Sequence, residues 1–286
     1  MAGLLSARTP SGRSTARAIL PAVLEGQPSP TAPASSLVLN VDPTPRTEAS
    51  RDADEYGDVV LLVDVLRTTT TVPLLFDGGM ASVALSPSLR VARRCAAEDG
   101  ALLIGERRGV PPEGFNHGNS PATLMYQRFD GATAFMVSEN APAALPYMTN
   151  ARLVVLASLV NASAAARLAS ERAERRIDVV GCGFRGDAGL DDLLTAGFLA
   201  DRIWRRRPEF VLTGAARMAL DLVQAESDPL RLLWSSRSGR YLRRLGLERD
   251  LGVAADIDRS EVVPLLGEPL DRHGGAVFPF RPADAP

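Results

Sequence analysis

Short apolar runs alternate with amphipathic or alanine-rich stretches along most of this 286-residue chain. The apolar runs have the length of buried strands, and the stretches between them have the length of helices. This alternation predicts an α/β fold, in which a largely parallel sheet is flanked by helices. Strands are predicted at 36–41, 59–63, 82–85, 102–104, 132–137, 152–157 and 177–180, and helices at 89–98, 161–175, 191–205, 213–226 and 238–245.

The two ends of the chain differ in composition from its middle. Residues 1–34 are rich in Ala, Ser, Pro and Arg, and Glu25 is their only acid. Arg-rich, acid-poor leaders can be transit peptides, but the prolines of this stretch would break a targeting helix. We therefore expect a disordered or misassigned N-terminal extension at 1–34, one domain at 35–268 and a C-terminal tail at 269–286.

Composition argues against several classes of partner. The formal net charge of −2 disfavours nucleic acid and anionic membrane surfaces, which are bound by strongly basic proteins. No apolar run approaches the ~20 residues that span a bilayer. Cys95 and Cys182 cannot build a disulfide framework and lack the spacing of metal ligands, so a reducing cytoplasm is the expected location. Arginine-rich helical faces are compatible with a homodimer.

All 32 basic residues of the chain are arginine. The chain therefore has no lysine for a Schiff base or for a phosphate-binding loop. Cationic recognition of an anion must come from arginine, whose planar guanidinium suits bidentate contacts to phosphate or sulfonate oxygens. The absence of lysine can equally reflect genome composition, so it excludes these mechanisms without identifying another.

Polar residues directly follow the predicted strand at 59–63. Asp64 and Arg67 come first, and four threonines from Thr68 to Thr71 come next. Open α/β sheets bind ligands at the carboxyl ends of their strands. A carboxylate, a guanidinium and several hydroxyls at such an end have the chemistry to hold a metal-bound phosphate. A threonine-rich turn with Asp64 as a helix cap is the alternative interpretation.

Further polar clusters stand at the ends of other predicted strands. They lie at 105–109 with the loop at 114–121, at 138–142, and at 181–192. Glu106 and Arg107 repeat the pairing of an acid with an arginine, which at a surface turn would contribute little energy. The glycine-rich loop at 114–121 offers several donors and lets a ligand approach its backbone. His117 in that loop is more typical of a hydrogen-bonding residue than of an acid–base group.

The glycines of residues 181–186 form the dinucleotide-binding pattern G-x-G-x-x-G after a predicted strand. No acid stands at the end of a following strand about 20 residues later, where the ribose contact belongs. The next helix instead opens with Asp187, Asp191 and Asp192. These carboxylates would repel a pyrophosphate unless a cation lay between, and Mg²⁺ suits carboxylate oxygens. Helix capping is the simpler interpretation, but it needs only one acid.

Six ordered motifs resemble those of the 2-phosphosulfolactate phosphatase family, the ComB-like proteins. They are D-V-L-R-T-T-T at 64–70, G-E-R at 105–107, G-F-x-x-G-N-S-P at 114–121, S-L-V-N at 158–161, the stretch at 181–197, and a tail from 238 to 251. The resemblance covers most of the chain from about 36 to about 265. Six motifs in order are far more specific than any one of them.

The resemblance implies an α/β fold particular to this family, which could consist of two α/β lobes with the site between them. It also implies Mg²⁺-dependent hydrolysis of (R)-2-phospho-3-sulfolactate to 3-sulfolactate and phosphate, a step toward coenzyme M. Asp64, Arg67, Glu106 and Arg107 are then the expected catalytic residues, and the two arginines would bind the phosphate and a second anionic group. The expected Mg²⁺ ligands are Asp64, Glu106, Asp191 and Asp192, and the expected substrate-binding residues are Thr68, Thr69, Thr70, Asn119, Ser120, Asn140 and Asn161.

The chain also departs from the family pattern. Asn116 stands where the family usually has Asp, and the stretch at 138–142 replaces the usual T-N-G-T while keeping Asn140. These changes motivate the alternative of a divergent, non-catalytic member that binds a small phosphorylated ligand. In both interpretations the partner is a small anionic phosphoester. A nucleotide-dependent oxidoreductase that uses the glycines at 181–186 is disfavoured by the charge of the acids that follow them.

Overall fold

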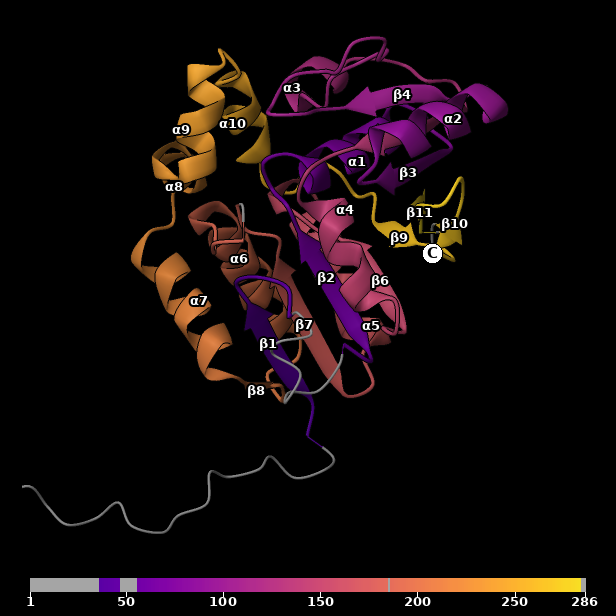
Figure 1. Ribbon diagram of the computed structural model, residues 1–286. Coiled ribbons are helices and arrows are strands. Elements are labelled where there is room, and N and C mark those ends of the chain that lie inside the picture. The colour runs from indigo at the N-terminus through magenta and orange to yellow at the C-terminus, as the bar shows by residue number, and fades with distance from the viewer. Residues whose placement is uncertain (1–35, 47–55, 185, 284–286) are drawn as a thin grey trace, which may run out of the picture. The chain divides into compact units, whose positions relative to one another are not determined.

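The computed structural model describes residues 36–46, 56–184 and 186–283 of the chain. The expectation for 1–34 therefore lies outside the described residues. The predicted α/β class is confirmed, because a mostly parallel sheet of eleven described strands is flanked by helices and does not close into a barrel (Figure 1). The described residues from 36 onward belong to one compact unit, Ala34–Pro286.

The strands are β1 (Val38–Asp42), β2 (Val59–Val63), β3 (Ser82–Ser86), β4 (Leu102–Gly105), β5 (Thr133–Val137), β6 (Leu153–Leu156), β7 (Arg176–Gly181), β8 (Val211–Leu212), β9 (Pro264–Leu266), β10 (Leu270–Asp271) and β11 (Ala276–Pro282). The helices are α1 (Thr68–Asp77), α2 (Leu89–Asp99), α3 (Pro121–Leu124), α4 (Ala141–Ala144), α5 (Ala162–Arg172), α6 (Leu190–Arg206), α7 (Gly214–Ala225), α8 (Pro229–Ser235), α9 (Arg237–Arg244) and α10 (Arg249–Ala254). Short 3₁₀ turns occupy η2 (Leu145–Met148) and η3 (Leu159–Asn161).

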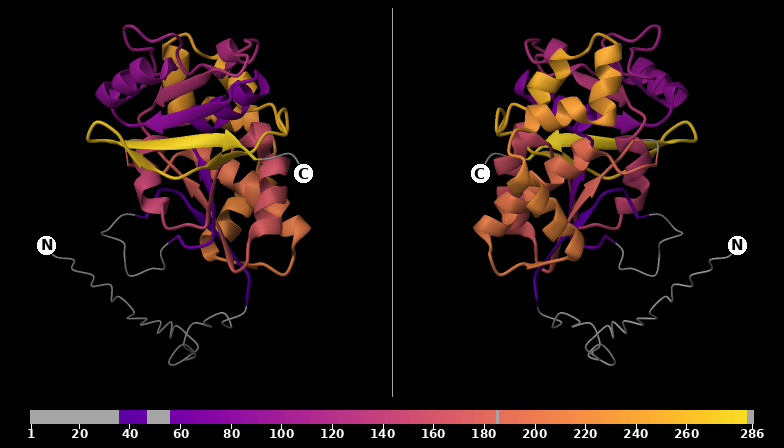
Figure 2. Two further views of the ribbon diagram at one scale, coloured as in Figure 1. Left: turned by 90° about the vertical axis from the view of Figure 1, so that its right-hand side faces the viewer. Right: turned by 90° about the vertical axis from the view of Figure 1, so that its left-hand side faces the viewer.

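The sheet contains two parallel groups of strands. One group has the order β4-β5-β3, and the other has the order β6-β2-β7-β1-β8. β11 and β9 join the groups through antiparallel pairing, from β3 to β11, from β11 to β9 and from β9 to β6. Figure 2 shows β11 in yellow as it crosses between the two groups. The two halves thus share one continuous sheet.

β2 lies between β6 and β7 in its group and is buried along its full length. Val59, Leu61 and Val63 pack into one apolar cluster, and Val60 and Leu62 pack into another. Because successive side chains of a strand point to opposite faces, a strand covered on both faces must be apolar at every position. This explains the uninterrupted apolar run before Asp64. Among the described helices, none has both the length and the apolar character needed to cross a bilayer.

The C-terminal segment differs from the tail expected at 269–286. β11 fills the centre of the sheet, where Phe278 pairs with Leu85 of β3 and Phe280 pairs with Leu266 of β9. The Phe278 and Phe280 side chains are 2% and 0% exposed. Pro279 and Pro282 interrupt the run in the sequence, and prolines weaken the signal of a central strand because they cannot donate a ladder hydrogen bond.

Candidate active site

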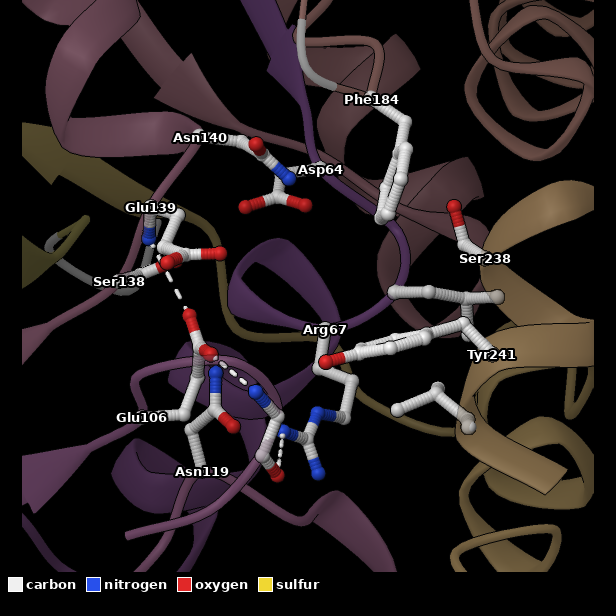
Figure 3. Close-up of a pocket in the computed structure, with 13 residues that line it drawn as sticks. Asp64, Arg67, Glu106, Asn119, Ser138, Glu139, Asn140, Phe184, Ser238 and Tyr241 are labelled. Carbon is white, nitrogen blue, oxygen red and sulfur yellow. Dashed lines mark hydrogen bonds between the residues drawn. The ribbon is translucent and has the colours of Figure 1, made fainter. Parts of the chain in front are cut away.

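A pocket lies where the ends of β2, β4 and β5 meet α9 (Figure 3). Its empty space is about 420 Å³, open solvent included. Figure 3 shows Phe184 and Tyr241 on one side of this pocket, with Glu106 and Glu139 on the other. The lining residues are Asp64, Leu66, Arg67, Glu106, Gly109, Asn119, Ser138, Glu139, Asn140, Phe184, Ser238, Tyr241 and Leu242.

Asp64 sits at the end of β2 with only 3% of its surface exposed. Its Oδ2 accepts a hydrogen bond of 3.3 Å from the Ala141 backbone N–H, and its carboxylate is also hydrogen-bonded to Thr68. Burial is the main cause that raises the pKa of Asp64 to about 6; the hydrogen bonds oppose it, and the nearby charges of Glu106 and Asp191 add to it. Carboxylates from three separate segments therefore converge here.

Glu106 lines the pocket, but both of its carboxylate oxygens are already occupied. Oε2 accepts a hydrogen bond of 2.6 Å from the Gly109 N–H, and Oε1 accepts one of 3.2 Å from the Glu139 N–H. The side chain thus ties the turn after β4 to the end of β5. Gly105 permits this close approach, because a Cβ at its φ of +141° would lie 2.1 Å from the Val137 carbonyl oxygen.

Asp191 and Asp192 begin α6 and lie just behind the pocket lining. Asp192 accepts hydrogen bonds of 3.0 Å from the Val65 N–H and 2.8 Å from the Gly183 N–H. Burial, followed by the charges of Asp191 and Asp64, raises the pKa of Asp192 well above its usual range. Burial also raises the pKa of Asp191, although a hydrogen bond with Ser238 opposes it. Asp191 Oδ1 is buried and has no hydrogen-bond partner among the described residues.

Asp192 also keeps the glycine-rich loop after β7 from binding a dinucleotide. It occupies the Gly183 N–H, one of the amides that a pyrophosphate would need. Gly183 has a φ of +68°, and its Cα approaches the Asp187 carbonyl so closely that a Cβ would lie 2.3 Å from that oxygen. Protein atoms therefore already fill the space beside Gly181 and Gly183, whereas a Cβ at Gly186 would meet no atom within 4 Å.

The expected set of four metal ligands is only partly suited to hold an ion. In the described part of the chain, no three His, Cys, Asp or Glu side chains are grouped as a metal site. Asp192 and Glu106 already accept two backbone hydrogen bonds each. Asp64 remains as a pocket carboxylate, and Asn119 Oδ1 is a buried pocket oxygen with no hydrogen-bond partner among the described residues. The Asp64 carboxylate fits Mg²⁺, which usually keeps several waters and takes one or two carboxylates together with substrate phosphate oxygens.

The two arginines expected at the site point in different directions. Arg67 lines the pocket and is 5% exposed, with Nη1 3.0 Å from Asp250 Oδ2 and Nη2 donating to the Gly109 carbonyl at 2.8 Å. Arg107 does not line the pocket, and its guanidinium donates instead to the Pro87 carbonyl. Arg67 is therefore the arginine that the fold brings to this pocket.

The expected substrate-binding residues also divide into two groups. Asn119 and Asn140 line the pocket, whereas the hydroxyls of the first turn of α1 bond to neighbouring protein atoms. Thr68 is hydrogen-bonded to the Asp64 carboxylate and to the Ser138 hydroxyl, Thr69 accepts from the Asp64 N–H, and Thr70 donates to the Val65 carbonyl. Thr69 and Thr70 thus hold the backbone of residues 64–65, and the Thr68 and Thr70 hydroxyls are already used within the protein.

Ser120 and Asn161 lie outside the pocket lining. Ser120 donates to Asp250 at 2.5 Å. Asn161 caps η3, where it accepts from the Ser158 N–H and donates to the Leu156 and Val262 carbonyls. Ser120 is thus used by the Asp250 carboxylate and Asn161 by backbone groups, so neither is free to bind a ligand.

The loop at 114–121 contributes less to the pocket than its polar composition predicts. Asn116 accepts a hydrogen bond of 2.7 Å from the Leu103 N–H and thereby covers the edge of β4. The His117 ring packs edge-on against Phe129, with 6.1 Å between the ring centroids. The loop residue with a side chain in the pocket lining is Asn119. The replacement at Asn116 thus lies outside the pocket.

Several lining residues were not expected from the sequence. Ser138 and Glu139 directly follow β5, so the strand-end argument could have assigned them. Ser238, Tyr241 and Leu242 share one face of α9 through their i, i+3, i+4 spacing, but no sequence rule indicates which helix covers a pocket. Phe184 and Tyr241 form an aromatic wall, with 6.0 Å between their ring centroids.

A family model and several relatives match most of this chain. A family model described as 2-phosphosulpholactate phosphatase matches residues 46–269. A Thermus thermophilus protein named "Probable 2-phosphosulfolactate phosphatase" is 40% identical over 215 residues, which cover 74% of this chain and 89% of the relative. A Deinococcus radiodurans protein of the same name is 38% identical over 225 residues, covering 78% and 93%. The residues matched by the family model include every residue that lines the pocket.

Proposed function

This chain belongs to the 2-phosphosulpholactate phosphatase family, and we propose that it hydrolyses 2-phospho-3-sulfolactate, or a related small phosphorylated acid, to the hydroxy acid and phosphate. The observation that carries the proposal is the meeting of Asp64, Arg67 and Asn119 in one pocket within the matched region. The names of the relatives supply the substrate. A role in a route toward coenzyme M, and a cytoplasmic location, belong to the same proposal.

Dependence on Mg²⁺ is part of the proposal. Asp64 would hold the ion at the pocket, with Asp191 behind it as a further carboxylate. Bound Mg²⁺ would neutralise charge on the phosphoryl oxygens. The buried position of Asp64, which is crowded by the charges of Glu106 and Asp191, favours a cation at this place.

Residues of the chain supply the other parts of a phosphatase site. Arg67 has five N–H donors, of which the protein uses one for Asp250 and one for Gly109. The remaining donors can contact an anionic oxygen of the substrate, as can the Asn140 amide. Phe184 and Tyr241 would exclude water from the other side of the bound ester.

The test is phosphate release by the purified full chain from 2-phospho-3-sulfolactate and a panel of small phosphoesters, with Mg²⁺ or with EDTA. The expected result is release that requires Mg²⁺ and is highest for a short phosphorylated acid. Asp64→Asn should abolish it while the variant still unfolds in one cooperative thermal transition, which shows that it is folded. Arg107→Gln is the matched control, since its side chain lies off the pocket.

The same panel decides against the non-catalytic alternative or for it. Absence of turnover for every ester, together with a raised unfolding midpoint in the presence of one of them, would replace the enzyme by a binding protein. Of the positions that motivated this alternative, Asn116 bonds to Leu103 outside the pocket, and Ala141 donates its N–H to Asp64.

A further inference from the structure

A buried carboxylate that does not line the pocket is bonded to residues that do. Asp250 of α10 is 0% exposed. Its Oδ2 pairs with Arg67 Nη1 at 3.0 Å, and its Oδ1 accepts hydrogen bonds from the Ser120 hydroxyl at 2.5 Å and the Ala122 N–H at 3.2 Å. A carboxylate so deeply buried needs such partners, because an unpaired charge is costly inside a protein. Asp250 thus joins α10 to segments that precede it by more than a hundred residues.

The Arg67 guanidinium, which pairs with Asp250, also bonds to the turn after β4. Nη2 donates to the Gly109 carbonyl at 2.8 Å, while the Gly109 N–H donates to Glu106 Oε2 at 2.6 Å. The same turn is held from α9 by the Tyr241 hydroxyl, which donates to the Arg108 carbonyl at 2.9 Å. Arg67 and Glu106 therefore both bond to Gly109, and Figure 3 draws both in its lower half.

A guanidinium is a rigid fork, so fixing one of its nitrogens fixes the direction of the others. We propose that Asp250 is a positioning residue of the active site: its carboxylate orients Arg67 in the pocket and, through Gly109, holds the turn that carries Glu106. Asp250 does so without lining the pocket. The kinetic part of this inference rests on the proposed phosphatase function.

The test is a double-mutant cycle on the full chain, with Asp250→Asn, Arg67→Lys and the double variant. Asn keeps the shape of Asp250 but removes the charge that orients the guanidinium. Lys keeps the charge of Arg67 but cannot contact Asp250 and Gly109 together. We expect Asp250→Asn to lower kcat/KM at least tenfold in the wild-type background and less than twofold in the Arg67→Lys background.

Asp258→Asn is the matched control, because Asp258 pairs with Arg202 on α6 and does not line the pocket. It should change kcat/KM less than twofold in both backgrounds. Losses that multiply in the Asp250→Asn, Arg67→Lys double variant would overturn the inference, since Asp250 would then act independently of Arg67. Wild-type kcat/KM in Asp250→Asn would overturn it as well.

Hydrogen–deuterium exchange gives a reading that does not need turnover. The Gly109 N–H, which is bonded to Glu106, should exchange at least tenfold faster in Asp250→Asn and at the wild-type rate in Asp258→Asn. Unchanged exchange at Gly109 would refute the positioning role even in a chain that hydrolyses no ester. Should Asp250→Asn not fold, Ser120→Ala removes one anchor of the carboxylate and should speed the same exchange a fewfold, and an unaltered rate there would also refute it.

Discussion

Neighbouring side chains after the end of β4 point in different directions. Glu106 lines the pocket, whereas Arg107 reaches the Pro87 carbonyl. The sequence shows that an acid and an arginine follow β4, but not which of them faces inward. The same limit applies to Asn161, whose amide is used up by the backbone it caps.

This direction predicts unequal roles for the two arginines. Arg107→Gln should leave kcat/KM within about twofold of the wild type, because the side chain does not line the pocket and bonds to the Pro87 carbonyl. Arg67→Gln should lower kcat/KM at least a hundredfold, since a charged hydrogen bond to a phosphate oxygen is worth roughly 1.5–3 kcal/mol and the buried Asp250 also loses its partner. Steady-state phosphate release measures both, and equal losses would contradict the assignment.

The crowded carboxylates predict a pH dependence of stability. In the folded chain the pKa of Asp64 is raised to about 6 from an ordinary value of 3.8, so folding favours its protonated form. The stability that Asp64 contributes is therefore fully present below pH 3.8 and is lost as the pH rises through about 6. The raised pKa values of Asp191 and Asp192 act in the same direction.

Urea unfolding in EDTA measures this effect by comparison with Asp64→Asn, which cannot titrate at that position. Between pH 4 and 7 the variant should gain on the order of 3 kcal/mol in free energy of unfolding relative to the wild type. A constant difference across that range would show that Asp64 is not held in this environment. Added Mg²⁺ should reduce the gain, because a bound cation favours the charged carboxylate.

Regular elements with strong periodicity were predictable from the sequence, and elements formed by distant pairing were not. The run at 59–63 is β2, and the alanine-rich stretch at 161–175 contains α5. The four threonines suggested a turn but open α1, where buried hydroxyls bond to carbonyls of the preceding segment. β11 could not be inferred, because its pairing with β3 joins residues nearly two hundred positions apart.

The central position of β11 predicts a large cost for truncating its side chains. Phe280 is fully buried between β3 and β9, so Phe280→Ala should lower the free energy of unfolding by roughly 3–5 kcal/mol. Chemical denaturation monitored by circular dichroism measures the change. Arg281→Ala on the same strand is the control, since its side chain is exposed, and it should change stability by less than about 1 kcal/mol. Similar losses in both variants would mean that β11 is not a core strand.

The residues of the pocket come from both parallel groups of the sheet. Asp64 comes from the end of β2 in one parallel group, whereas Glu106 and Asn140 follow β4 and β5 of the other group. The sequence predicts the α/β class and the polar strand ends, but strand order depends on long-range pairing that a single sequence does not display. The meeting of the two groups at one pocket is what makes a shared phosphate and metal site physically reasonable.

A crystal structure of the full chain with Mn²⁺ in place of Mg²⁺ and with orthovanadate as a phosphate mimic tests that shared site most directly. Anomalous scattering would locate the metal without reference to its ligands. We predict a single strong metal peak within about 2.3 Å of an Asp64 carboxylate oxygen, with vanadate beside it and in contact with Arg67. A metal peak away from Asp64, or vanadate bound outside this pocket, would contradict the assignment of the hydrolytic centre.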